Sequence, residues 1–286
     1  MPRKLKQFGG WATVRIKKHE IEALSRNVRK IIDGQDIDLR VNNEGTWNIL
    51  RNDIHILAQL KNEQVAVLQH DRAALKDTLA DISHQLKTPL TSMTIMADLL
   101  EHAPPDKQTE FIQSIKAGLA RTDWLVSTLL KMAKLDAGAV TFANEKIQAS
   151  ALTALALEPL QIQLELKNQS VACAGEVILC CDKRWTIEAL TNIIKNASEH
   201  APGNSEIKIE AGANPICAWI SVTDEGKGLS NAQRAKLFQR FEGSQSSAGF
   251  GIGLPLAMAI MREQGGDIEV SNSQNAGATF TLKFFK

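Results

Sequence analysis

Apolar residues recur every seven positions between residues 47 and 82, a spacing typical of a helix with a continuous apolar row. We predict one long helix that begins near Trp47 and forms a coiled-coil seam, which the polar Lys61 interrupts. Pro89 should kink this helix further along. The seam requires a partner helix, because an isolated helix leaves its apolar row exposed. Its rows comprise Trp47, Ile54, Leu68, Leu75, Ile82, Leu50, Leu57, Leu79 and Leu86.

A second helix is predicted from about residue 107 to residue 137, after a short connection at residues 102–106 that contains two prolines. A connection this short makes the two helices antiparallel neighbours. Two antiparallel helices bury little apolar surface, so we expect a homodimer in which two hairpins form a four-helix bundle. The apolar side of the second helix comprises Phe111, Ile115, Leu119, Val126 and Leu129.

The pattern changes after Gly138 to short elements of both kinds. Runs typical of strands, mainly of the hairpin type, are mixed with helical stretches, which predicts an α+β layer, an α/β sandwich. The expected fold class is therefore a helical N-terminal part, with a linker and a helical hairpin, followed by this sandwich. Helices are predicted at residues 147–160, 184–199 and 253–264, and strands at 170–173, 177–181, 206–210, 217–223, 267–271 and 278–285.

Length and charge exclude several classes of protein. The chain has 286 residues, enough for about two domains, and its 33 basic and 32 acidic residues give a net charge of +1, which argues against a nucleic-acid partner. No apolar run approaches the roughly 20 residues that cross a bilayer, and no signal peptide is visible. We therefore expect a cytoplasmic location. The first 18 residues are basic, which fits either a solvated terminus or a segment beside the membrane, in the cytoplasmic part of a membrane-anchored bacterial sensor.

The sequence contains four cysteines, and none has the spacing of a metal site. Cys180 and Cys181 are adjacent, which places them poorly for sharing one metal ion. We predict that all four, Cys173 and Cys217 included, are buried free thiols in a reducing compartment.

One histidine is predicted on the outer side of the long helix. At about 100° per residue, Ile82 and Leu86 share the buried face, while His84 lies opposite them. Asp81 and Thr88, about one turn before and after the histidine, share its outward side. A lone histidine on a helix surface is usually an ordinary solvated residue, so its meaning depends on the rest of the chain.

Four further motifs follow in the C-terminal half. Asn192 and Asn196 are one turn apart on a predicted helix, and Asp224 follows a predicted strand in the sequence Asp-Glu-Gly-Lys-Gly. The run Leu-Phe-Gln-Arg-Phe at 237–241 comes next, and three alternating glycines at 249–253 open a helix. Each motif alone has an ordinary explanation, such as a surface asparagine or a turn. No parallel βαβ pattern surrounds the glycines, which argues against a dinucleotide-binding fold.

In this order, the motifs resemble those of the sensor histidine kinases of two-component systems, over about residues 68 to 286. Residues 81–91 resemble the phosphoacceptor box. Residues 192–196 resemble the N box of the ATP-binding fold shared by gyrase, chaperones, kinases and mismatch-repair proteins. The resemblance implies a kinase that transfers the γ-phosphoryl group of ATP to His84 and then to an aspartate of a response regulator, and that also acts as a regulator phosphatase.

The resemblance also implies roles for individual residues. Asp224 would accept the adenine amino proton, Asn196 would hold Mg²⁺ through its side-chain oxygen, and Arg240 would neutralise charge on the transferring phosphoryl group. Thr88 would align the water that attacks the regulator's phosphoaspartate. Glycine amides and a helix start would face the triphosphate. The nucleotide-binding set is Asn192, Lys195, Asn196, His200, Asp224, Gly226, Gly228, Arg240, Gly249, Gly251, Gly253, Leu254 and Thr279, and the catalytic set is His84, Gln85, Thr88 and Asp81.

Two positions depart from the family's pattern. Gln85 stands where a carboxylate usually follows the phosphoacceptor histidine, and an amide supplies no full negative charge. Glu199 and His200 stand where the family often has a lysine and an aromatic residue, so one triphosphate contact is in doubt and Lys195 is the candidate substitute. These departures leave open a scaffold that binds ATP only as a conformational ligand. An ATPase or protein-serine kinase of the same ATP fold is a further alternative, against which the phosphoacceptor box argues.

Residues 20 to about 60 resemble a divergent HAMP-type signal linker, with a first helix at 20–33, then Gly34, and Glu44-Gly45 before the next helix. A plain coiled-coil leader is the alternative. We expect Mg-ATP as cofactor, and a second copy of the chain and a response regulator as partners. The expected domains are a basic segment at 1–19, the linker at 20–66, a dimerisation and phosphotransfer domain at 67–138 and a catalytic ATP-binding domain at 139–286.

Overall fold

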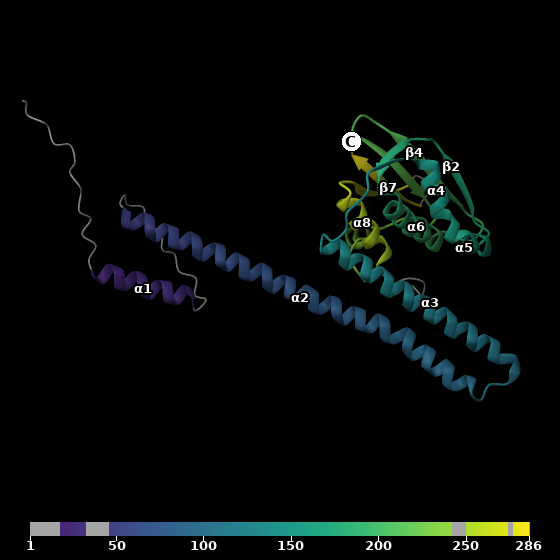
Figure 1. Ribbon diagram of the computed structural model, residues 1–286, viewed down its shortest axis with the longest axis horizontal. Helices are drawn as coiled ribbons and strands as arrows, with labels where there is room; N and C mark the ends of the chain where they lie inside the picture. The colour runs from purple at the N-terminus through teal and green to yellow at the C-terminus, as the bar shows by residue number, and fades with distance from the viewer. Residues whose placement is uncertain (1–17, 33–45, 242–249, 274–276, 286) are drawn as a thin grey trace, which may run out of the picture. The chain divides into compact units, whose positions relative to one another are not determined.

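A computed structural model describes residues 18–32, 46–241, 250–273 and 277–285 (Figure 1). The chain divides into two compact units after Leu79. Of the basic segment only Lys18 and His19 are described, and Gly34, Glu44 and Gly45 lie outside the described residues. The HAMP-type linker therefore stays a prediction.

The two N-terminal helices have the bounds that the sequence predicts to within two residues. α1 (Lys18–Ile32) is amphipathic, and α2 (Thr46–Leu100) begins beside Trp47. Pro89 does not end α2, which continues helical to its last residue. Leu57, Leu68 and Leu75, three members of the expected seam, are 59 to 67% exposed in the single chain. An exposed apolar row of this kind is what a coiled-coil helix presents without its partner.

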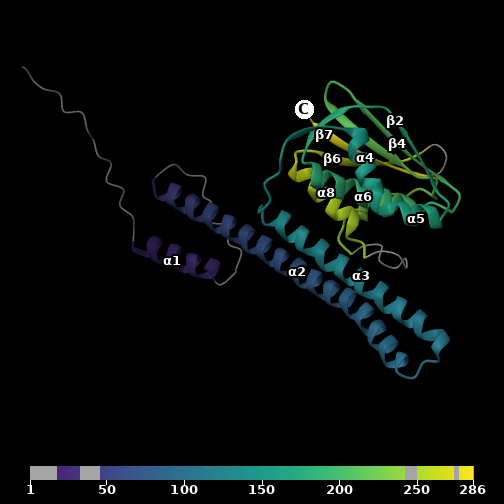
Figure 2. The same cartoon turned by 45° about the vertical axis from the view of Figure 1, so that its right-hand side comes forward.

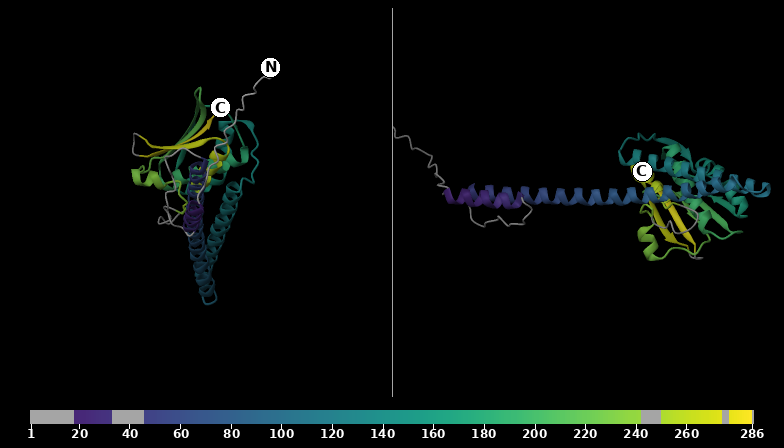
Figure 3. Two further views of the ribbon diagram at one scale, coloured as in Figure 1. Left: turned by 90° about the vertical axis from the view of Figure 1, so that its left-hand side faces the viewer. Right: turned by 90° about the horizontal axis from the view of Figure 1, so that it is seen from below.

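The second unit opens with a helical hairpin. After α2 the chain turns at residues 101–104, and α3 (Pro105–Asp136) runs back antiparallel to the end of α2 (Figures 1 and 3). Pro105 occupies the first turn of α3, where a missing N–H has no helical partner to lose. Gly118 lets the helices approach each other, because a Cβ atom at this position would lie 2.6 Å from Cγ of Met93.

α3 has two apolar faces, and the expected apolar side is wrong in part. Leu125, Met132 and Leu135 are buried in the core shared with the α/β layer, whereas Leu119 and Val126 are 56% and 41% exposed. The expected row is displaced because the C-terminal half of α3 packs on the α/β layer with a neighbouring row of residues. The exposed row stays available to another partner helix.

The α/β layer is built on a five-stranded sheet in the order β2-β4-β5-β7-β6. All neighbouring strands are antiparallel except β2 and β4, which are parallel. A separate two-stranded sheet pairs β1 with β3. The strands are β1 (Glu145–Gln148), β2 (Ser170–Ala174), β3 (Ile178–Cys181), β4 (Glu206–Ala213), β5 (Cys217–Thr223), β6 (Asp267–Asn272) and β7 (Ala278–Phe285).

Helices cover one face of the large sheet, which confirms the predicted sandwich (Figure 2). Alternate strand residues such as Ile207, Ile220 and Phe280 point into the core, where they join Leu190 and Ile193 of the longest covering helix. The remaining elements are α4 (Ala149–Leu157), the 3₁₀ helix η1 (Glu158–Leu160), α5 (Gln161–Leu166), α6 (Lys183–His200), α7 (Asn231–Lys236) and α8 (Gly253–Glu263).

Several predictions made from local sequence patterns in this layer are wrong. Residues 145–148 form a strand, although the predicted helix began at 147, because they pair with β3, which lies 30 to 36 residues later in the chain. The short helices α5 and α7 were not expected. Cys181 and Cys217 are buried free thiols as predicted, but Cys173 and Cys180 are exposed. Side chains alternate across a strand, so Cys180 points away from the core that holds its neighbours Leu179 and Cys181.

None of the described helices combines the length and apolar content that a membrane span requires.

Candidate functional site

The predicted N box lies on α6, a helix whose N-terminal end is fixed by Asp182. One carboxylate oxygen of Asp182 accepts a hydrogen bond from the Trp185 amide (3.0 Å) and the other from the Ala143 amide (2.9 Å). The Asp182 amide donates in turn to Oε1 of Gln264, at the end of α8 (2.7 Å). The cap therefore ties the start of α6 to α8 and to the segment before β1.

One face of α6 forms the wall of a pocket of about 490 Å³. Asn192, Lys195, Asn196 and Glu199 share this face because they recur at three- and four-residue spacing, while Ile193 and neighbouring residues fill the core. Seven of the predicted nucleotide-binding residues line the pocket, namely Asn192, Lys195, Asn196, His200, Gly251, Gly253 and Leu254.

The start of α8 forms another part of the pocket wall. Its N-cap residue, Ile252, provides no side-chain cap, so the first amides of the helix keep their capacity to bind an anion. Gly253 leaves room that any other residue would fill, because a Cβ atom there would lie 2.7 Å from Oδ1 of Asn192. Asn192 is buried, and its Nδ2 donates to the Glu188 carbonyl (2.8 Å). Its side-chain oxygen is thereby directed toward the glycine.

Lys195 is held between an acid and an aromatic ring. Its Nζ lies 3.8 Å from Oε1 of Glu199 and 4.7 Å from the ring centroid of Trp124, which belongs to α3. Burial raises the pKa of Glu199, and the nearby Lys195, His200 and Lys167 oppose that rise. The acid that replaces the family's lysine thus lies partly buried in the pocket wall, beside the cation proposed to substitute for it.

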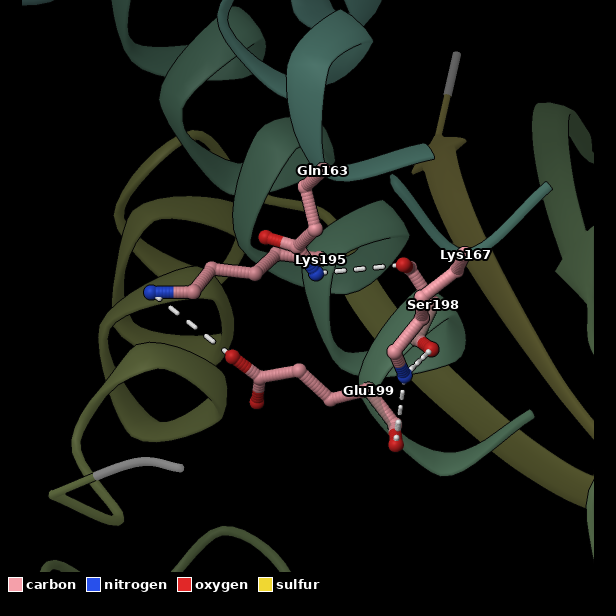
Figure 4. A network of polar contacts seen from close by, with 5 residues as sticks. All are labelled: Gln163, Lys167, Lys195, Ser198 and Glu199. Carbon is pink, nitrogen blue, oxygen red and sulfur yellow. Dashed lines mark hydrogen bonds and ion pairs between the residues drawn. The ribbon is translucent and has the colours of Figure 1, made fainter. Parts of the chain in front are cut away.

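The C-terminal end of α6 is fixed by a polar network (Figure 4). Lys167 Nζ donates to the carbonyls of Ser198 (2.6 Å) and Glu199 (3.2 Å), and Gln163 Nε2 donates to the Ser198 hydroxyl (3.1 Å). A cation at the last carbonyls of a helix satisfies groups that have no helical partner and complements the helix dipole. This network fixes the backbone from which the Glu199 side chain extends.

Asp224 occupies a separate, buried position after β5. Its Oδ1 accepts hydrogen bonds from the amides of Gly226 (2.7 Å) and Ala278 (3.2 Å), and only 3% of the residue is exposed. Its Oδ2 accepts no hydrogen bond from any other described residue, so the acceptor that would recognise an amino group is available. Gly226 is required here, since a Cβ atom would lie 2.8 Å from Oδ1 of Asp224 and 3.0 Å from the His200 carbonyl oxygen.

Two more predicted residues lie near Asp224 in the fold. Gly228 adopts φ +68°, a left-handed conformation that favours glycine. Thr279 faces Thr223 across the β5–β7 ladder, with 3.0 Å between their hydroxyl oxygens. Asp224, Gly226, Gly228 and Thr279 do not line the pocket beside α6.

Arg240 does not line the pocket. Its Nη2 lies 2.7 and 2.8 Å from the two carboxylate oxygens of Asp136, the last residue of α3. The structure therefore separates this arginine from the other predicted phosphate-binding residues. Gly249 lies outside the described residues.

The segment that resembles a phosphoacceptor box has the geometry that helical periodicity predicts. Ile82 and Leu86 are partly buried against the core, whereas His84 and Thr88 are exposed and line an open groove of about 540 Å³. The Thr88 hydroxyl donates to the His84 carbonyl (3.1 Å), one turn earlier. Asp81 is also exposed and Gln85 is partly buried, and neither lines the groove.

Sequence reasoning missed several residues that line the pocket beside α6, and three of them carry an aromatic ring or a charge. Trp124 comes from α3, Phe250 stands between two predicted glycines, and Lys236 ends α7. The rings of Trp124 and Phe250 stack with 6.0 Å between their centroids. Phe250 could have been found from its place inside the glycine motif, whereas Trp124 and Lys236 lie outside every motif of the sequence.

The residues of the pocket can be tested for their fit to a magnesium nucleotide. No cluster of three histidine, cysteine or acidic residues suited to a metal is found among the described residues. Asn196 lines the pocket, and its side chain makes no hydrogen bond with any described residue, which leaves an amide oxygen of the kind that Mg²⁺ prefers. Together with Lys195 and the uncapped start of α8, it fits a metal-bound triphosphate.

Two family models match the chain in the order of its two functional parts. Residues 74–138 match the His Kinase A (phospho-acceptor) domain, and residues 181–286 match the histidine kinase-, DNA gyrase B- and HSP90-like ATPase. Among curated proteins, the heme sensor protein HssS of Staphylococcus saprophyticus is 30% identical over 72% of this chain and 45% of its own length. The sensor-like histidine kinase SenX3 of Mycobacterium tuberculosis is 25% identical over 90% of this chain and 68% of its own length. The chain spans about half the length of HssS.

Solved structures share the fold at lower identity. The Acinetobacter baumannii histidine kinase AdeS superposes with a TM-score of 0.61 at 21% identity, over 71% of this chain and 97% of that chain. The histidine kinase ThkA, in a complex with the response regulator protein TrrA, gives a TM-score of 0.63 at 20% identity, over 79% of this chain and 66% of that chain. The chain matches a phosphoacceptor domain followed by an ATP-binding domain, and its relatives include a sensor protein and a sensor-like histidine kinase. The chain therefore belongs to the sensor histidine kinases of two-component systems.

Proposed function

We propose that this chain is an ATP-dependent protein histidine kinase that phosphorylates its own His84. The observation that carries the proposal is the pocket beside α6, in which Asn192, Lys195 and Asn196 face the glycine-bordered, uncapped start of α8. This combination of an amide oxygen, a cation and free backbone amides suits a triphosphate with its metal.

The proposed reaction transfers a phosphoryl group from an oxygen atom of ATP to a nitrogen atom of His84. Nε2 of His84 attacks the γ-phosphorus of ATP, the bond to the β–γ bridging oxygen breaks, ADP leaves, and the imidazole loses its Nδ1 proton to solvent. Mg²⁺ held by Asn196 would neutralise charge on the phosphates. Asp224 would bind the adenine amino group, and Lys195 would contact the phosphates in place of the family's lysine. The chain itself contributes mainly positioning and charge neutralisation.

The phosphoryl group would then pass to an aspartate of a response regulator at the groove around His84. The exposed histidine and the groove that contains Thr88 support such a docking site. ThkA, a relative by fold, is described in a complex with its response regulator. The exposed apolar rows of α2 and α3 support the homodimer, and residues 67–138 and 139–286 are the proposed functional domains.

Labelled ATP separates this function from its alternatives. The chain is incubated with Mg-ATP labelled at the γ-phosphate, and the stability of the protein-bound label is measured. We expect a label that is labile in acid and stable in base, lost in His84→Gln and kept in His102→Gln, an exposed histidine in the hairpin turn that serves as the matched control. Free phosphate without protein label would indicate an ATPase, and nucleotide binding without either product would indicate a scaffold.

A second variant tests the metal site. Asn196→Ala should abolish the label while leaving the circular dichroism spectrum unchanged, because Asn196 lies in the pocket wall rather than in the core. Full activity in a folded Asn196→Ala protein would remove this residue from the site.

A further inference from the structure

The ion pair between Arg240 and Asp136 joins the two functional parts of the chain. Both carboxylate oxygens of Asp136 lie within 2.8 Å of Nη2 of Arg240. Arg240 lies in a motif of the ATP-binding domain, whereas Asp136 ends the second helix of the phosphoacceptor hairpin. Neither residue lines the nucleotide pocket. The arginine expected at a phosphoryl group is therefore held by a protein carboxylate.

A carboxylate and a phosphoryl group compete for the same cation. Both present paired oxygens to the planar guanidinium, which donates N–H groups in a fixed fork. A guanidinium whose Nη2 is held by Asp136 outside the nucleotide pocket is less able to stabilise charge that develops on a transferring phosphoryl group.

We propose that Asp136 is an autoinhibitory residue, which holds Arg240 on α3 and thereby lowers the rate of His84 phosphorylation. This inference rests on the proposed kinase function. Release of Arg240 from Asp136 precedes transfer, so any signal that shifts α3 along or away from the ATP-binding domain changes the kinase rate. In this switch, Arg240 leaves the carboxylate of Asp136 and binds the transferring phosphoryl group.

The backbone beside Arg240 is strained, as is common in segments that change conformation. Phe241 has φ +64°, a left-handed conformation that a bulky residue rarely adopts. It is kept there by burial of its ring and by a hydrogen bond from its amide to the Gly251 carbonyl (3.0 Å). Strain of this kind persists only where surrounding contacts maintain it, and it is common in switch regions.

Further contacts keep α3 in place and Asp136 within reach of Arg240. Lys131 of α3 pairs with Glu188 of α6 at 2.8 Å, and Trp124 stacks on Phe250. The Lys131–Glu188 pair lies outside the pocket, so α3 is attached to the ATP-binding domain independently of any nucleotide contact. Breaking the Arg240–Asp136 pair alone should therefore free the arginine without detaching α3.

The test compares the two partners of the pair. The initial rate of His84 labelling is measured at saturating Mg-ATP for Asp136→Asn, Arg240→Gln and the matched control Asp123→Asn, which changes an exposed aspartate on the same helix. We expect Asp136→Asn to be about two- to fivefold faster than the wild type, the range for a partly exposed ion pair. Arg240→Gln should be slower, and Asp123→Asn unchanged. Asp136→Glu keeps the charge and should restore a rate near that of the wild type.

The opposite changes in labelling rate expected for Asp136→Asn and Arg240→Gln distinguish inhibition from a structural role. Equal losses in Asp136→Asn and Arg240→Gln would overturn the proposal, because a pair that only positions α3 affects both partners alike. An unchanged rate in Asp136→Asn, or in Arg240→Gln, would overturn it as well. A wild-type chain without label on His84 would refute the kinase function itself, which separates the two failures. Circular dichroism spectra confirm that each variant is folded.

Discussion

Gly253→Ala should weaken nucleotide binding while leaving the fold intact. The added Cβ atom would lie 2.7 Å from Oδ1 of Asn192, about 0.7 Å inside the 3.4 Å at which ordinary contact begins. Asn192 cannot yield easily, because it is buried and its Nδ2 is bonded to the Glu188 carbonyl. Either the asparagine or the start of α8 must move, and both line the proposed nucleotide site.

Helix preference and overpacking act in opposite directions in Gly253→Ala, and together they set the size of the effect. Alanine is a better helix former than glycine by up to about 1 kcal/mol, which offsets part of the cost to folding. Overpacking at a buried contact costs about 1 to 3 kcal/mol. If that cost falls on the binding geometry, the Kd for nucleotide rises about 5- to 150-fold, since 1.4 kcal/mol is a factor of ten. The melting temperature should fall only by the part of the overpacking cost that the fold itself bears and that the helix preference of alanine does not offset.

Titration with a fluorescent ATP analogue measures the Kd, and thermal melts follow the fold. Gly118→Ala is the matched control: its Cβ atom would also clash, but with the flexible Met93 side chain of the hairpin, away from the pocket. The double variant Gly253→Ala/Asn192→Ala should bind no more weakly than Asn192→Ala alone, because the clashing oxygen is gone. Wild-type affinity in Gly253→Ala would refute this account of the pocket.

Three further outcomes follow from single side chains. Thr88→Ala should slow dephosphorylation of the regulator about fivefold more than it slows autophosphorylation, the effect of one lost hydrogen bond to water; equal losses would make Thr88 merely structural. Gln85→Glu should speed labelling of His84 about 5- to 30-fold at saturating Mg-ATP by supplying a charged acceptor, and an unchanged rate would contradict this. Burial raises the pKa of Glu199. Between the ordinary pKa and the raised pKa, the folded protein therefore retains a proton on Glu199 that the unfolded chain has lost. The free energy of unfolding falls as the pH rises through this range, because the buried side chain becomes charged. Glu199→Gln should therefore raise the free energy of unfolding above neutral pH, with the gain shrinking in acid, as denaturant titrations at several pH values would reveal.

Periodic patterns in the sequence predicted the elements whose structure is set locally. The long helix from Trp47, the hairpin at residues 102–106 and the outward position of His84 follow from helical spacing, which is a property of neighbouring residues. The helix start after the glycine run was also predicted from neighbouring residues, and Gly253 leaves room there for a close approach of other atoms. Five motifs in family order added the function, which no single motif carried.

Only the tertiary structure could decide features that depend on distant partners. β1 is a strand because it pairs with β3, and the buried row of α3 differs from the predicted row because this helix packs on the α/β layer. Trp124 lines a pocket formed mainly by α6, α7 and α8, and Asp136 occupies Arg240 across 104 positions of the chain. Local propensity carries no information about such contacts, because burial and charge pairing are fixed only when separate segments meet.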